Sequence, residues 1–375
     1  MNAPGSDGHD ARDEESQPSE TGPATGTGLV LAAVAMVGMA VPVRQGVVDP
    51  AVIVGLGVAT VVVVIFLGRR WGALDRRFSG VAAAGSILVV VLAAYALNQG
   101  VGGRVGLPGL GNTVSAVFLA FLAAGVTIGL AVADLREVTI AGLASRVATT
   151  AQLSLLALIA WIVAPFVGFL LLLPFVAVAG EPTANQEQAI YNVGFAIGTA
   201  AFAIAYVSYT DRGWSFFDLR VPSLRAVGWI VGGVGVVLLA NVVMSYVFAS
   251  GGVEVAEHSS TQEAAQNPEL LYVMIPASIL IIGPFEELLY RNVIQKSMYD
   301  AFSPAGAIVV SSVIFAAVHA PAASMYGLGA TLPFLAVIFG LSLILGTIYW
   351  RTGNLVVPAL VHGLYNAVVF STVVL

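Results

Sequence analysis

The sequence predicts an all-α fold, a polytopic transmembrane helical bundle of about eleven spans preceded by a disordered acidic N-terminal tail. Three observations predict it: 58% of the 375 residues are hydrophobic, only 10% are charged, and long apolar runs recur along the chain. A soluble domain carries about 25% charged residues, so this chain has too few polar groups to cover a water-facing surface. We therefore expect membrane lipid to replace water over most of its exterior.

The N-terminal tail, residues 1–26, differs in composition from the rest of the chain. It holds six acidic residues against the single Arg12 and is rich in Pro, Gly, Ser and Thr. Such a segment cannot bury enough apolar surface to offset the entropy of ordering, which predicts disorder. Because it also lacks the basic region of a signal peptide, we expect the first apolar run to be kept as a membrane span.

Eleven apolar segments approach the roughly 20 residues that a helix needs to cross a bilayer core. They cover residues 28–43, 51–68, 79–98, 113–133, 151–179, 189–208, 227–249, 271–290, 304–319, 332–350 and 355–375. The fifth contains Pro165 and Pro174, which predict either a kink or a continuation along the membrane interface. We divide the chain after the tail into an N-terminal transmembrane region, 27–250, with about seven spans and a C-terminal core, 270–375, with four.

The basic residues indicate the orientation of these spans. If the N-terminus is cytoplasmic and the sides alternate, thirteen of the fifteen basic residues fall inside, and only Arg44 and Arg104 fall outside. Such an asymmetry is what the positive-inside rule requires. The sequence thus predicts a multi-pass protein of the cell membrane with its N-terminus in the cytoplasm.

Two adjacent carboxylates, Glu286 and Glu287, lie in the otherwise apolar span 271–290. A carboxylate at mid-bilayer costs roughly 2.5–3.5 kcal/mol on insertion scales, so intramembrane acids tend to be functional. Glu287 and Arg291 are four residues apart on one helix face and can form an ion pair. Glu286 points about 100° away, which leaves it free to act as a base. The alternative is that both carboxylates are solvated at the cytoplasmic edge of the membrane.

Two histidines, His319 and His362, lie in or at the ends of apolar spans downstream of this pair. Phe315 lies one turn before His319, and His362 shares a helix face with Asn366 at i, i+4. The other two histidines fall in the tail and in an external loop: His9 and His258. A single membrane histidine is more often a helix–helix hydrogen bond than a catalyst. Three polar groups on three of four consecutive helices indicate a shared site.

These residue types suit hydrolysis. A carboxylate beside a neutral imidazole can take a proton from water, and a second imidazole with an amide donor can stabilise an oxyanion. Glu, His and His are also a ligand set of catalytic zinc, so a divalent metal stays open while no other cofactor is expected. The chain has no cysteine, which excludes thiolate nucleophiles and cysteine-bound metals.

Three motifs occur in order, Glu286-Glu287-x-x-x-Arg291, Phe315-x-x-x-His319 and His362-x-x-x-Asn366. Together they resemble the motifs of the CPBP family of intramembrane proteases, which includes the type II CAAX prenyl endopeptidases and abortive-infection proteins. The resemblance covers about residues 270–370 and implies an intramembrane endopeptidase whose substrate is a protein or peptide, in some relatives prenylated. Nucleic acid is not an expected partner.

The resemblance also implies roles for the individual residues. Glu286 would activate water with the help of His319, while His362 and Asn366 would bind water or the oxyanion. Glu287 and Arg291 would support the site. The family has been described both as metalloproteases and as using a metal-free glutamate mechanism, and the spacing does not choose between them.

One geometric difficulty and two alternatives accompany this prediction. On straight helices, His319 lies far from the cytoplasmic end of its span and His362 near it, so the two meet only if helices are tilted or broken, or if span nine starts before Pro304. A non-catalytic membrane scaffold or immunity protein would keep the same fold. A proton-coupled transporter could use the same acids and histidines, but it favours inverted repeats, which the sequence does not show.

Overall fold

The computed structural model describes residues 22–106 and 113–374, and most of them are helical. Within this part of the chain, nine helical segments are long and apolar enough to cross a membrane, and the helices Pro304–Val318 and Val356–Ser371 are apolar but shorter. The protein is therefore an all-α, integral multi-pass membrane protein. Every expected apolar segment coincides with a helix, while the number of bilayer crossings stays a prediction.

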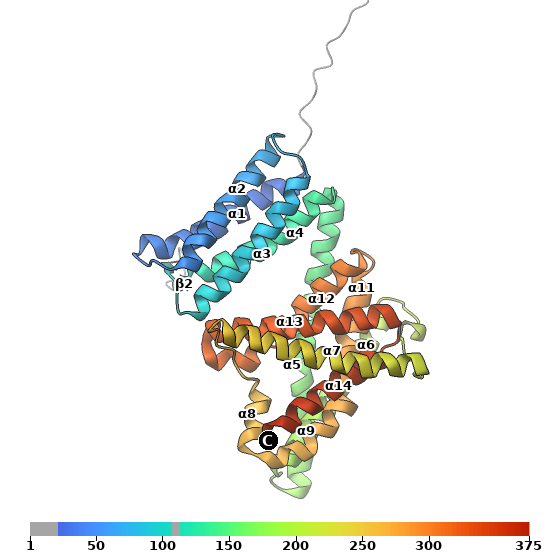
Figure 1. Ribbon diagram of the computed structural model, residues 1–375. Coiled ribbons are helices and arrows are strands. Elements are labelled where there is room, and N and C mark those ends of the chain that lie inside the picture. The colour runs from blue at the N-terminus through green and yellow to red at the C-terminus, as the bar shows by residue number, and fades with distance from the viewer. Residues whose placement is uncertain (1–21, 107–112, 375) are drawn as a thin grey trace, which may run out of the picture.

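The first four helices form a bundle of their own at one end of the molecule (Figure 1). They are α1 (Pro23–Arg44), α2 (Pro50–Arg70), α3 (Arg77–Asn98) and α4 (Ala116–Leu135). Each packs against the next, and α1 also packs against α4, so the four close on a core of small and branched apolar residues. Because α1 begins at Pro23, the last residues of the expected tail are helical. Residues 1–21 lie outside the described residues.

Two short paired strands lie between α3 and α4, where the sequence predicted an earlier start of the fourth span. Strand β1 (Arg104–Gly106) pairs antiparallel with β2 (Thr113–Ser115). The fourth span was expected from residue 113, but α4 begins at Ala116 because the Ser115 side chain accepts a hydrogen bond from the Phe118 amide and caps the helix.

Three helices follow the bundle: α5 (Ile140–Ala179), α6 (Ala184–Tyr209) and α7 (Leu224–Ser250), with the 3-10 turn η1 (Trp214–Phe216) before the last. Helix α5 starts eleven residues before the expected span and contains both Pro165 and Pro174 within one 40-residue helix. Its N-cap, Thr139, accepts a hydrogen bond from the Gly142 amide, which explains the early start. Figure 1 shows α5 running from the bundle past the remaining helices.

The C-terminal core is built from four helical segments. The first is continuous over Pro268–Met298 and comprises η2 (Pro268–Leu270), α9 (Leu271–Ala277), η3 (Ser278–Ile282), α10 (Gly283–Glu287), η4 (Leu288–Gln295) and α11 (Lys296–Met298). The others are α12 (Pro304–Val318), α13 (Gly327–Thr352) and α14 (Val356–Ser371), with α8 (Ser259–Gln266), η5 (Ala320–Tyr326) and η6 (Thr372–Val374) at their ends. Helices α5 and α6 pack on one side of this core and α7 on another.

Candidate active site

Glu287 and Arg291 form a fully buried ion pair on the helix that spans Pro268–Met298. The Arg291 Nε donates to a Glu287 carboxylate oxygen at 2.9 Å, and both side chains are completely shielded from solvent. A second guanidinium nitrogen donates to Ser342 Oγ on α13 at 3.0 Å. The predicted i, i+4 pair is confirmed, and the alternative of a solvated pair of glutamates is wrong for Glu287.

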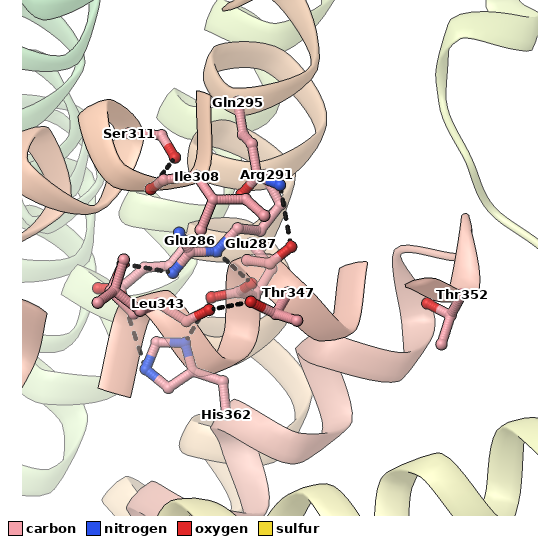
Figure 2. Close-up of polar contacts among 12 residues, drawn as sticks. Glu286, Glu287, Arg291, Gln295, Ile308, Ser311, Leu343, Thr347, Thr352 and His362 are labelled. Atoms are coloured by element: carbon pink, nitrogen blue, oxygen red, sulfur yellow. Dashed lines mark hydrogen bonds and ion pairs between the residues drawn. The ribbon is translucent and has the colours of Figure 1, made fainter. Parts of the chain in front are cut away.

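His362 of α14 lies between the two glutamates, as Figure 2 shows. Its Nδ1 is 3.1 Å from a Glu287 oxygen and its Nε2 is 3.6 Å from a Glu286 oxygen. Because Glu287 is paired with Arg291, its carboxylate accepts, and the proton of a neutral His362 therefore lies on Nδ1. The Nε2 lone pair then faces Glu286, whose side chain is 17% exposed.

Glycine contacts between backbones bring His362 to this position. A Cβ at Gly283 would lie 2.7 Å from the Ala359 carbonyl oxygen, and a Cβ at Gly363 would lie 2.5 Å from the Ser278 carbonyl oxygen. Only glycine allows two helices to approach this closely. The glutamate helix is also wound as a π-helix on both sides of the Glu pair, in η3 and η4. Such segments are frequent at functional sites.

Phe315 joins the second motif to the first and third. Its ring centroid lies 4.6 Å from that of His319 and 5.9 Å from that of His362. Its ring also packs edge-on against Tyr290 at 4.8 Å and lies beneath the Arg291 guanidinium at 5.1 Å. The two histidines therefore converge on one aromatic ring, which resolves the difficulty of their depth.

The convergence comes from helix direction rather than from an earlier helix start. Helix α12 begins at Pro304, with the Ser303 hydroxyl accepting from the Gly306 amide as its cap. It ends at Val318, so His319 lies at the junction with η5. Figure 1 shows α14 running obliquely to α13. Oblique crossing brings residues at different distances from their helix ends to a common depth.

His319 and Asn366 are the remaining predicted site residues, and they differ in their hydrogen bonds. The His319 Nδ1 is 2.7 Å from the Phe315 carbonyl oxygen. A carbonyl can only accept, so Nδ1 carries the proton and Nε2 of the neutral ring is an acceptor. Asn366 is half-buried one turn after His362, and among the described residues no protein group hydrogen-bonds its side chain. Its amide is therefore available to a substrate.

A second polar network, which no sequence motif predicted, anchors the far end of the glutamate helix. Asn292 donates to the Phe216 carbonyl oxygen at 3.2 Å and to the Tyr349 hydroxyl at 2.9 Å. The Tyr349 hydroxyl donates to Asp218 at 2.6 Å, and the Lys296 ammonium pairs with the same carboxylate at 2.8 Å. The network ties the 214–218 turn to η4 and α13, so the helix that carries Glu286 is held rigidly beyond the site.

The donor set does not fit the zinc site that the sequence left open. Among residues 22–106 and 113–374, no three His, Asp or Glu side chains gather as metal ligands. The oxygens of Glu287 bind Arg291 and His362, and the His319 Nδ1 faces the Phe315 carbonyl. Glu287 is thereby engaged with protein groups, and since the described side chains are not gathered as metal ligands, we derive no step through a metal.

Sequence reasoning missed His258, which it placed in an external loop apart from the site. The His258 ring lies 6.3 Å from His319, centroid to centroid, and 5.9 Å from Phe334. Burial lowers the pKa of His258 to about 4, His319 adds to this effect and the nearby Glu286 opposes it. No spacing rule could have found this residue, because the loop returns to the site only in the folded chain.

Comparisons with known proteins agree with the geometry. The model of the Rce1-like type II CAAX prenyl endopeptidase family matches residues 268–368, a range that includes all six predicted site residues and excludes His258. The chain is 28% identical over 233 residues to the membrane-embedded CAAX protease MroQ of Staphylococcus aureus strain USA300. That alignment covers 58% of this chain and 87% of the relative. No solved structure matches the chain.

Proposed function

Because this chain belongs to the CPBP family of intramembrane proteases, we propose that Glu286 is the base with which it hydrolyses a peptide bond near the membrane surface. The observation that carries the proposal is the contrast within the Glu pair. Glu287 has both oxygens bound, whereas Glu286 is partly exposed, and its one ion-pair contact among the described residues is with the His362 Nε2, at 3.6 Å. A carboxylate in this position can accept a proton from water.

The reaction follows from these positions. Water attacks the substrate carbonyl carbon and gives its proton to Glu286, with the His319 Nε2 accepting a hydrogen bond from the same water. The oxyanion that forms is stabilised by the Asn366 amide and by the Nε2–H of a His362 that took its second proton from solvent before the reaction and keeps it throughout. Glu286 then returns the proton to the amide nitrogen as the C–N bond breaks, which yields the new amine and carboxylic acid.

Glu287 and Arg291 support this chemistry without entering it. The Glu287 carboxylate fixes the tautomer of His362 and stabilises its protonated form, and Arg291 keeps Glu287 ionised inside the protein. Removing either partner would leave a buried charge, so both are positioning residues in this proposal.

We propose that the substrate is a membrane-anchored protein processed at its C-terminus in the manner of CAAX proteins. The support is the description of the matching family and the printed name of the relative. A prenyl group on the substrate would hold the scissile bond at the depth of Glu286.

We further propose a cell-membrane location with the N-terminus in the cytoplasm, for which the distribution of basic residues is the support. Single cysteines at Glu181 and Val221, in a chain without others, would test this by one-sided labelling: Val221 should react only from inside and Glu181 only from outside.

The test is hydrolysis of a peptide library by the protein purified in detergent, with farnesylated and unmodified C-termini. The wild type should cleave, and Glu286→Gln should reduce kcat by about 10²–10⁴, since general base catalysis is worth that much. Glu181→Gln, at an exposed glutamate in a connecting loop, is the matched control and should retain full activity. Equal activity of wild type and Glu286→Gln would refute the assignment of the base. Equal rates on farnesylated and unmodified peptides would refute the prenyl requirement alone.

A further inference from the structure

His258 is a third imidazole beside the candidate active site, supplied by the loop between α7 and α8. It is half-buried, and its ring lies edge-to-face with that of His319 at 6.3 Å. Phe334 of α13 packs on it at 5.9 Å. Since the family match begins at residue 268, His258 belongs to a part of the chain that the family resemblance does not cover.

Contacts from two other elements hold the loop in place. The Asn98 side chain, at the end of α3, donates to the Glu254 carbonyl oxygen at 2.7 Å and accepts from the Glu254 amide at 3.1 Å. The Asn98 side-chain amide also donates to the Gly329 carbonyl oxygen of α13 at 3.0 Å. The Ala256 amide donates to the Ala330 carbonyl oxygen at 3.1 Å. The loop is thus fixed from both the N-terminal bundle and the core just before it reaches His258.

The hydrogen bonds define the tautomer of each histidine. The Ser260 amide donates to the His258 Nδ1 at 3.2 Å, and the Ser260 hydroxyl lies 2.7 Å from the same nitrogen. Because an amide N–H can only donate, Nδ1 is an acceptor and the proton of the neutral His258 ring lies on Nε2. The His319 Nδ1 instead donates to the Phe315 carbonyl oxygen, so its Nε2 is an acceptor. The two neighbouring rings therefore carry one hydrogen-bond donor and one hydrogen-bond acceptor on their Nε2 atoms. One water with two hydrogen bonds of about 2.8 Å each joins nitrogens up to about 5.6 Å apart, a separation that rings with centroids 6.3 Å apart allow.

We propose that His258 is a positioning residue of the hydrolytic site, whose Nε2–H holds the attacking water against the His319 Nε2 and within reach of Glu286. This inference rests on the proposed function. The loop 251–258 then helps to place the attacking water, and the Asn98 contacts connect the N-terminal bundle to the site.

The competing explanation is that His258 only caps α8. Its Nδ1 accepts from the Ser260 amide as a helix N-cap does. Two substitutions separate the roles of the two ring nitrogens. His258→Asn keeps a good cap acceptor near the position of Nδ1 but has no group at Nε2. His258→Gln places an amide N–H near the position of Nε2 but is a poor cap.

The experiment measures kcat and KM for both variants on the peptide that the wild type cleaves best, with thermal unfolding as the check on folding. His258→Asn should stay as stable as the wild type and lose on the order of tenfold to hundredfold in kcat with little change in KM. His258→Gln should be less stable and retain more kcat than His258→Asn. Wild-type kcat in His258→Asn, or a lower kcat in His258→Gln than in His258→Asn, would overturn the proposal in favour of the cap.

A second readout does not depend on turnover. The chain has four histidines, so nitrogen-15 spectra of histidine-labelled protein contain few signals. We expect His258 as the Nε2–H tautomer, His319 as the Nδ1–H tautomer, and a shift of the His319 signals in His258→Asn. Unchanged His319 signals in that variant would overturn the water bridge even if no peptide were cleaved. Absence of cleavage by the wild type, with the expected spectra, would instead count against the proposed function.

Discussion

The α1–α4 bundle and the C-terminal core each bury a carboxylate among apolar helices, and they treat it differently. In the bundle, Asp134 receives two hydrogen bonds from Arg69, at 2.9 and 3.1 Å, and a further one from the Ser79 hydroxyl. In the core, Glu287 is bound in the same manner by Arg291 and His362. The core differs because a second carboxylate, Glu286, directly precedes Glu287 and has no hydrogen bond within the described residues.

This contrast distinguishes a structural charge from a chemically available one in a membrane protein. A buried carboxylate with both oxygens bound to protein groups has no capacity left for water or substrate. A half-buried carboxylate beside an imidazole, with its oxygens free, can still bind water or substrate. The bundle therefore uses its charge for helix packing. In the function that we propose, Glu287 of the core supports the site and Glu286 takes part in the reaction.

The largest expected effect comes from removing the cation of each pair. Arg291→Ala leaves Glu287 buried without its partner and should lower the free energy of unfolding by about 3–5 kcal/mol. Arg69→Ala should cost less, because the Arg69 side chain is 18% exposed and water can replace part of its contacts. Unfolding curves in detergent measure both. Equal losses of unfolding free energy in the two variants would mean that the deeper burial of the Arg291–Glu287 pair does not make it more important for stability.

A smaller effect is expected from the close helix contact that brings α14 to the Glu pair. Gly363→Ala places a methyl group 2.5 Å from the Ser278 carbonyl oxygen and 2.7 Å from the Ile279 Cα. We expect a loss of about 1–3 kcal/mol in the free energy of unfolding and a fall in kcat, because His362 moves away from Glu286. Gly232→Ala on α7, where a Cβ meets no atom within 4 Å, is the control and should be neutral or slightly stabilising. A Gly363→Ala protein with full activity would show that the close approach is not needed.

A third effect is the dependence of stability on pH through His258. Its pKa is about 4 in the folded protein, with His319 and Glu286 as the titratable groups that face it, against about 6.5 in the unfolded chain. Between these values the unfolded state binds more protons, so stability should rise as pH increases from 4 to 6.5 and gain nothing more from this residue above 6.5. His258→Asn should flatten this part of the profile. An unchanged slope in that variant would show that His258 is not the group responsible.

Much of the candidate site could be predicted from the sequence because its parts are local. The i, i+4 spacing of Glu287 and Arg291 predicted their ion pair, and the same spacing placed His362 and Asn366 on one face of α14. The start of α5 and the paired strands β1 and β2 were not predicted, since caps and strand pairing outside the apolar runs leave no hydropathy signal. The position of His362 between the two glutamates was also not predicted. It depends on the close approach at Gly283 and Gly363, which are two among many glycines in apolar helices.

By itself, the sequence determined that this chain lies in a membrane, where its apolar helices run, and which carboxylate pairs with Arg291. These properties follow from composition and from helical periodicity, which act over a few residues. Only the tertiary structure decided that His362 bridges Glu286 and Glu287, that Phe315 joins the two histidines, and that His258 returns to the site from its loop. Contacts of this kind depend on how helices cross and how closely they pack. In membrane helices the sequence constrains this packing only through a few small residues and polar contacts.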